Sequence, residues 1–138
     1  MAEIKYSLNV INSQVFAPKE EGWSETVNLR FTEEIPGFVT DKETGAKEEA
    51  NVKSISVFTS EAIKAMASTS SNLSAFLSGK THEEKMQLLP MLLNGAVVTI
   101  SRTLIEEEQK YITTIESVVV NDDMMNRVNM ALDKLFGF

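Results

Sequence analysis

The amino-acid sequence predicts a mainly β fold with helices, in which five strands and a helical segment form one domain and a last helix follows. Apolar and polar residues alternate over residues 4–16 and 23–32, which is the period of a half-buried strand. Three further segments are rich in β-branched side chains: 51–59, 96–105 and 110–120. A chain of 138 residues can bury a core without disulfides or metal.

Each of the first two strands has one apolar face. The apolar positions are Ile4, Tyr6, Leu8 and Val10 in the first strand, and Trp23, Val27, Leu29 and Phe31 in the second. This pattern assigns Tyr6 and Phe31 to the core. Pro18 and Gly22 bracket the turn between these strands, whereas Pro36-Gly37 ends the second strand or bends it as a bulge would.

The middle of the chain contains a third strand between two less regular segments. Residues 40–50 are polar and contain a glycine, which predicts an exposed loop. In the strand at 51–59, Ile55 and Val57 point one way and Val52 and Phe58 the other, and Phe58 is also assigned to the core. The strand runs into a short helical stretch at 60–66, and the Ser- and Ala-rich residues 67–80 predict a loop or a frayed helix.

A capping box predicts the start of the next helix. Thr81 lies three residues before Glu84, and the helix continues to Asn94-Gly95, with Pro90 as a possible kink or division point. Strands at 96–105 and 110–120 follow, and the polar turn between them predicts an antiparallel hairpin. Asp122 or Asp123 caps a final amphipathic helix, which packs on its own domain or on a neighbouring subunit.

The chain is acidic, with 13 Lys and Arg against 20 Asp and Glu and a net charge of -7. The acids come in runs at expected loops and helix starts, such as Glu106-Glu107-Glu108. The strand segments instead carry cations, of which the first four oppose an apolar position of their strand in this interpretation: Lys5, Arg30, Lys53, Arg102 and Lys110. Together these cations predict one basic face of the sheet, if that face is continuous.

The sequence offers no basis for catalysis, so we expect a protein that is not an enzyme. His82 is the one histidine, at a helix start, where a surface position is the ordinary interpretation. There is no cysteine, no metal-ligand spacing and no phosphate-binding glycine loop, so neither a metal nor a cofactor is expected. Without a signal peptide or an apolar run long enough to span a bilayer, a cytoplasmic location away from membranes is expected.

The order of the elements is that of the five-stranded oligonucleotide/oligosaccharide-binding (OB) barrel, with a helical segment between the third and fourth strands. Three stretches of sequence resemble bacterial-type single-stranded DNA-binding proteins. They are an apolar strand ending in Phe and running into a helix (52–66), a Leu-x-Gly turn before a Val-rich strand ending in a basic residue and Leu (93–104), and the segment Tyr111-Ile112-Thr113-Thr114-Ile115. The resemblance implies an OB-type barrel over 1–121, followed by a C-terminal helix at 122–138.

The chain departs from that family in three ways. The segment between strands three and four is long, the strand faces are poor in aromatic residues, and a predicted helix ending in Phe136-Gly137-Phe138 replaces an acidic tail. The long segment suggests a divergent branch, of the phage or conjugative-plasmid type. The replacement of the tail by a helix argues against recruitment of partner enzymes through such a tail.

Single strands are held by aromatic faces that stack on bases and by cations that contact phosphates. The aromatic candidates are Trp23, Phe38 and Tyr111, of which Trp23 and Tyr111 fit packing as well as binding. The cationic candidates are Arg30, Lys53, Arg102 and Lys110.

The expected function is binding of single-stranded DNA, or RNA, with little sequence preference. Binding would be cooperative, through a dimer or a higher-order array on the strand, in replication or transfer of a mobile element. The alternative is a non-enzymatic protein-interaction or structural module, such as a virion or scaffold component. The acidic balance and the Met-rich final helix favour this alternative.

Overall fold

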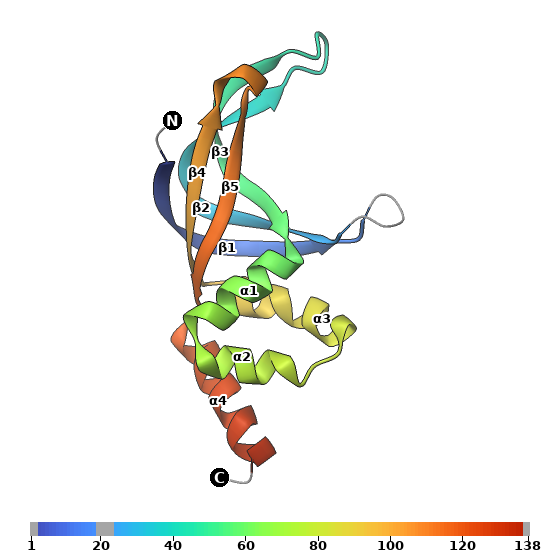
Figure 1. The fold of residues 1–138 in the computed structure, drawn as a ribbon, viewed down its shortest axis with the longest axis vertical. Coiled ribbons are helices and arrows are strands. Elements are labelled where there is room, and N and C mark those ends of the chain that lie inside the picture. The colour runs from blue at the N-terminus through green and yellow to red at the C-terminus, as the bar shows by residue number, and fades with distance from the viewer. Residues whose placement is uncertain (1–2, 19–23, 137–138) are drawn as a thin grey trace.

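The computed structural model describes residues 3–18 and 24–136. They form a five-stranded antiparallel sheet with four α-helices, which confirms the prediction of a mixed β/α fold. The strands are β1 (Glu3–Phe16), β2 (Thr26–Thr40), β3 (Lys47–Phe58), β4 (Val97–Ile105) and β5 (Lys110–Val119), in the spatial order β3-β2-β1-β4-β5. The helices gather at one end of the sheet, and the turn between β2 and β3 lies at the opposite end of the molecule (Figure 1).

The first strand, β1, joins the two halves of the sheet. Residues Glu3–Asn9 pair with β4, and residues Val10–Phe16 pair with β2. Strands that pass from one half-sheet to another in this way turn the corner at a bulge or bend. Each half-sheet therefore depends on β1 for its position relative to the other.

A β-bulge at Ile11 separates the two halves of β1. Val10 and Asn12 lie opposite consecutive residues of β2, so Ile11 is an extra residue in the ladder. One extra residue exchanges the two faces of a strand. The core-facing positions are therefore even-numbered up to Val10 and odd-numbered from Ser13 onward.

The second strand, β2, does not end at Pro36-Gly37 but continues to Thr40. The register with β3 shifts between Arg30 and Ile35, so the bend predicted as the alternative lies just before Pro36. A Cβ atom at Gly37 would lie 3.0 Å from both Cγ atoms of Val52. Glycine therefore allows β2 and β3 to approach closely here.

The prediction of an exposed loop over 40–50 is correct only for its centre. Residues Lys47–Ala50 belong to β3 and pair with the end of β2, so the connection shortens to 41–46. This part of the hairpin extends away from the core, and most of its residues are exposed. A strand that is exposed on both faces has no alternation of apolar and polar residues that would reveal it.

Glu33, in the irregular part of β2, binds β1 where the two strands separate. Its carboxylate accepts hydrogen bonds from the backbone N–H of Asn9 at 2.8 Å and from the Asn9 side-chain amide at 2.6 Å. These bonds, the side-chain bond most of all, lower the pKa of Glu33 to about 2. The contact therefore depends on an ionised carboxylate.

The helices are α1 (Thr59–Thr69), α2 (Ser71–Ser78), α3 (His82–Leu93) and α4 (Asp122–Phe136), and η1 (Glu106–Glu108) is the predicted turn between β4 and β5. The capping box of Thr81 and Glu84 is confirmed, and Pro90 does not divide α3.

The expectation of a loop or a frayed helix over 67–80 is wrong. The Ser70 hydroxyl caps α2 by accepting from the N–H of Leu73, and burial of Leu73 and Leu77 stabilises that helix.

The final helix, α4, shares the core of the sheet and the other helices. Val128 and Leu132 are buried in that core, and the side chain of Asn129 accepts a hydrogen bond of 2.9 Å from Asn72 of α2. Its buried residues therefore pack within this chain. No helix in the described part of the chain is both long and apolar enough to cross a bilayer.

Gly95, in the turn between α3 and β4, touches the residue that caps α4. Its φ is +80°, and a Cβ atom there would lie 2.7 Å from Nδ2 of Asn121. Asn121 Oδ1 in turn accepts a hydrogen bond of 2.9 Å from the backbone N–H of Met124, so Asn121 caps α4 and the expected cap at Asp122 or Asp123 is wrong. Gly45 has a similar φ of +72° but nothing within 4 Å of its added Cβ.

We expect Gly95→Ala to destabilise the protein more than Gly45→Ala. Both substitutions place an alanine in the left-handed region, at about 1–2 kcal/mol. Gly95→Ala also displaces the cap of α4, which adds about 1 kcal/mol. Unfolding in urea, followed by circular dichroism, measures both, and equal losses would contradict a role for the Asn121 contact.

We also expect Glu33→Gln to lower the free energy of unfolding by roughly 1 kcal/mol at pH 7, since the exposed position weakens a charged hydrogen bond. The folded pKa lies below the usual value of 4.5, so the contribution of Glu33 is complete above that pH and is lost as the pH falls toward 2. Urea unfolding across this range should show the difference between the two proteins shrinking. A difference that is constant with pH would contradict this account.

Candidate nucleic-acid interface

The half-sheet of β1, β2 and β3 has one face buried in the core and one face in solvent, here called the outer face. Val27 and Leu29 of β2 point into the core together with Ile55 and Val57 of β3. The residues between them point outward, and paired residues on neighbouring strands share a face. The register thus places nine residues of the outer face in three rows that cross the strands.

The first row is aromatic. Phe16 of β1 and Phe58 of β3 both pair with Thr26 of β2, one on each side. The two phenylalanines are 45% and 49% exposed, which is high for large apolar side chains. With strands about 4.8 Å apart, their Cα atoms are about 10 Å apart. Two exposed aromatic rings thus flank a threonine on the same face.

The other two rows are polar. Gln14, Asn28 and Ser56 form the second row, in which Asn28 Nδ2 donates to Ser56 Oγ at 3.2 Å. The third row consists of Asn12, Arg30 and Ser54, all exposed. The outer face therefore combines aromatic rings, amides, hydroxyls and one guanidinium, which are the groups that bind bases and phosphates.

Neither phenylalanine was expected here. The apolar pattern of β1 places position 16 on the core side, and the bulge at Ile11 reverses that assignment. The assignment of Phe58 to the core is wrong because it alternates with the buried Val57 and faces solvent. The sequence already places Phe58 on the opposite side of its strand from Ile55 and Val57, and this pattern could have predicted its exposure. No pattern in the sequence predicts the bulge.

Arg102 lies inside the fold and is 8% exposed. The expectation that it opposes the apolar positions of its strand is wrong, because it shares a face with the buried Val98 and Ile100. Lys5 pairs with Ser101 and therefore lies on the opposite face. The expected single basic face is thus interrupted.

The guanidinium of Arg102 is bound by protein groups. Nη1 donates to the carbonyl oxygen of Pro36, Nε donates to Thr113 Oγ1 at 3.2 Å, and Cζ lies 4.1 Å from the ring centroid of Tyr111. Burial lowers the pKa of Arg102, against the opposing influence of Tyr111 and Tyr6. The ring of Tyr111 also lies 5.6 Å from that of Phe38. These contacts hold the β2–β3 hairpin against β4 and β5.

The remaining predicted cations are distributed over the molecule. Lys53 lies 3.7 Å from Glu34 and Lys110 lies 2.9 Å from Glu108, both as exposed ion pairs. Of the predicted site residues that the structure describes, Arg30 alone lies within the three rows of the outer face. Trp23 lies outside the described residues. The structure therefore groups Phe38, Arg102 and Tyr111 in one cluster, apart from Arg30 and Lys53.

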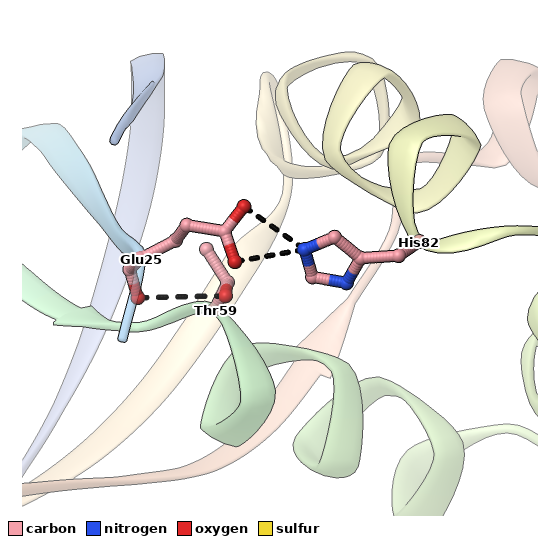
Figure 2. Close-up of polar contacts among 3 residues, drawn as sticks. All are labelled: Glu25, Thr59 and His82. Carbon is pink, nitrogen blue, oxygen red and sulfur yellow. Dashed lines mark hydrogen bonds and ion pairs between the residues drawn. The ribbon is translucent and has the colours of Figure 1, made fainter. Parts of the chain in front are cut away.

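His82 is exposed, as expected, but it is not isolated. Its Nε2 lies 2.8 and 2.9 Å from the two carboxylate oxygens of Glu25, as Figure 2 shows. Thr59 donates its hydroxyl to the carbonyl oxygen of Glu25 at 3.4 Å. The group links the starts of α3 and α1 to the segment before β2. Within residues 3–18 and 24–136 there is no cluster of three or more histidine or acidic side chains suited to a metal.

Comparisons with known proteins add no further assignment. The sequence matches no protein-family model and no curated protein. The arrangement of side chains on the outer face is therefore the basis for a functional proposal.

We expect Arg102 to stabilise the fold and Arg30 to have little effect on it. Arg102→Met keeps most of the apolar volume but removes the hydrogen bonds and the contact with Tyr111, at about 2–3 kcal/mol. Arg30→Met, on the exposed face, should change the free energy of unfolding by no more than about 0.5 kcal/mol. Chemical denaturation measures both, and equal effects would contradict the structural role of Arg102.

Proposed function

We propose that this protein binds single-stranded nucleic acid, primarily DNA, on the outer face of β1, β2 and β3. The observation that carries this proposal is the pair of exposed rings, Phe16 and Phe58, next to two polar rows. The second of these polar rows contains Arg30. Every base has a face that can stack on an aromatic ring, so such a surface binds with little sequence preference. Nothing in this mode of binding requires a cofactor or a catalytic group.

We further propose that the sheet is an OB-type barrel. The strand order, the sharing of β1 between two half-sheets, and the approach of Phe38 to Tyr111 across the open side support this assignment. In such barrels the face of the second and third strands binds oligonucleotides. The resemblance of 52–66, 93–104 and 111–115 to single-stranded DNA-binding proteins also supports this assignment. With it we propose a role in replication or transfer of a mobile element.

Three acids near this half-sheet are held by protein groups, which fixes their positions without removing the negative charge of the chain. Glu25 binds His82, Glu33 binds Asn9, and Glu34 lies beside Lys53. Other acids cluster at the far end of the molecule, where the carboxylate of Glu108 lies 2.9 Å from Lys110 Nζ. A net charge of -7 still opposes phosphates at long range, so we propose that self-association along the strand adds affinity.

A protein-interaction or structural module is the second candidate. It is favoured by exposed apolar side chains away from the outer face, such as Met130 on α4 at 62% exposure and Val119 on β5. These residues are separate from the aromatic row. Failure of the protein to bind any oligonucleotide would favour this candidate.

We expect Phe16→Ala and Phe58→Ala each to weaken binding of labelled oligo-dT by about 1–3 kcal/mol, the usual contribution of one stacked base. Arg30→Gln should reduce the slope of log K against log salt by about 0.7, the value for one phosphate contact on a single strand. Fluorescence anisotropy at several salt concentrations measures both.

Ile112→Ala is the matched control, since Ile112 is an equally exposed apolar residue on β5. It should leave affinity unchanged. Matched duplex should bind much more weakly than the single strand. Equal affinity for duplex, or an equal loss in the control, would refute the proposed site.

A further inference from the structure

The aromatic row is the last row of the outer face, so that face continues from it in one direction only. The β1–β2 ladder ends with the pair Phe16 and Thr26. The next residues on the same face are Gln14 on β1 and Asn28 on β2, which pair with each other. Gln14 is two residues from Phe16 on the same strand, a distance of about 7 Å. The edge of a base stacked on the Phe16 ring is therefore within reach of the long Gln14 side chain.

The carboxamide of Gln14 is available to a ligand. Two neighbouring polar side chains are already bound within the protein. The Ser13 hydroxyl donates to Asn94 Oδ1 at 2.7 Å, and Asn28 Nδ2 donates to Ser56 Oγ at 3.2 Å. Gln14 is exposed, and its side chain forms no hydrogen bond to another residue within the described ranges 3–18 and 24–136. Of these side chains, that of Gln14 has all of its donors and acceptors open to a bound strand.

A carboxamide is chemically matched to the Watson–Crick edge of an unpaired base. It presents an N–H donor beside a carbonyl acceptor. Each base presents an N–H donor beside an acceptor on that edge, such as N3–H beside O4 in thymine. Unpaired bases are read on this edge when they are stacked on aromatic side chains, whereas in a duplex the partner strand occupies it. Contact with the edge therefore selects unpaired bases without selecting one kind of base.

We infer that Gln14 forms hydrogen bonds with the Watson–Crick edge of the base stacked on Phe16, and that this contact makes the outer face selective for unpaired bases. The inference rests on the proposed function, which it extends by naming the part of the ligand that is recognised. Stacking on Phe16 contributes affinity for any exposed base. The Gln14 contact adds affinity only where the edge of that base is free.

The test blocks the Watson–Crick edge of thymine chemically. Oligo-dT in which every thymine is methylated at N3 lacks the N–H donor of that edge but keeps the rings, sugars and phosphates. Fluorescence anisotropy compares its affinity with that of ordinary oligo-dT for the unchanged protein, Gln14→Met and Gln87→Met. Methionine is similar to glutamine in length but has no amide. Gln87 is exposed on α3, outside the three rows, so Gln87→Met is the matched control. Thermal unfolding checks that each variant is folded.

We expect methylation to weaken binding about fivefold for the unchanged protein and for Gln87→Met, as loss of a hydrogen bond does, and to leave binding by Gln14→Met unchanged. Gln14→Met should itself bind ordinary oligo-dT and oligo-dC about fivefold more weakly than the unchanged protein. An equal loss on methylation in Gln14→Met, no loss in the unchanged protein, or an effect of Gln14→Met on oligo-dT alone would each overturn the inference. Those results leave the effects of Phe16→Ala and Phe58→Ala intact, whereas failure of those two effects overturns the proposed function itself.

Discussion

The double pairing of β1 is the constraint on which the rest of the structure depends. One strand must pair with β4 through its first half and with β2 through its second. The bulge at Ile11 allows this, and it exchanges the inward and outward positions of the strand. Phe16 therefore faces solvent beside Phe58 instead of entering the core. The same bulge that permits the fold creates the aromatic row.

The two arginines of the sheet show how burial separates structural from surface roles. Arg102 is surrounded by Pro36, Thr113 and Tyr111, and its hydrogen bonds are made within the protein. Arg30 is exposed between Asn12 and Ser54, and its charge is accessible to a ligand. The guanidinium of Arg102 joins two hairpins and so supports the shape of the half-sheet, although it lies outside the three rows of the outer face.

The sequence predicted the five strands and three of the four helices, but it missed α2 and did not predict which strand residues face solvent. Alternation, β-branched runs and the capping box at Thr81 correctly predicted five strands and the start of α3. Ile11 is an ordinary strand residue, so nothing marks it as the bulge that reverses β1. The burial of Arg102 depends on contacts with Pro36 and Tyr111, which are distant in sequence. Pairing of cations with acids on other strands has the same non-local origin.

The proposed binding on the outer face combines two interactions, stacking on aromatic rings and attraction of phosphates by cations. Stacking on two rings is a short-range interaction that salt does not screen, whereas attraction by one or two cations is weak and screened. A net charge of -7 slows the approach of phosphates, so a single protein offers contact without electrostatic steering. Binding under these conditions gains most when a neighbour already occupies the strand, since the second contact then becomes intramolecular. The proposed mode of binding therefore predicts an array of proteins along the strand.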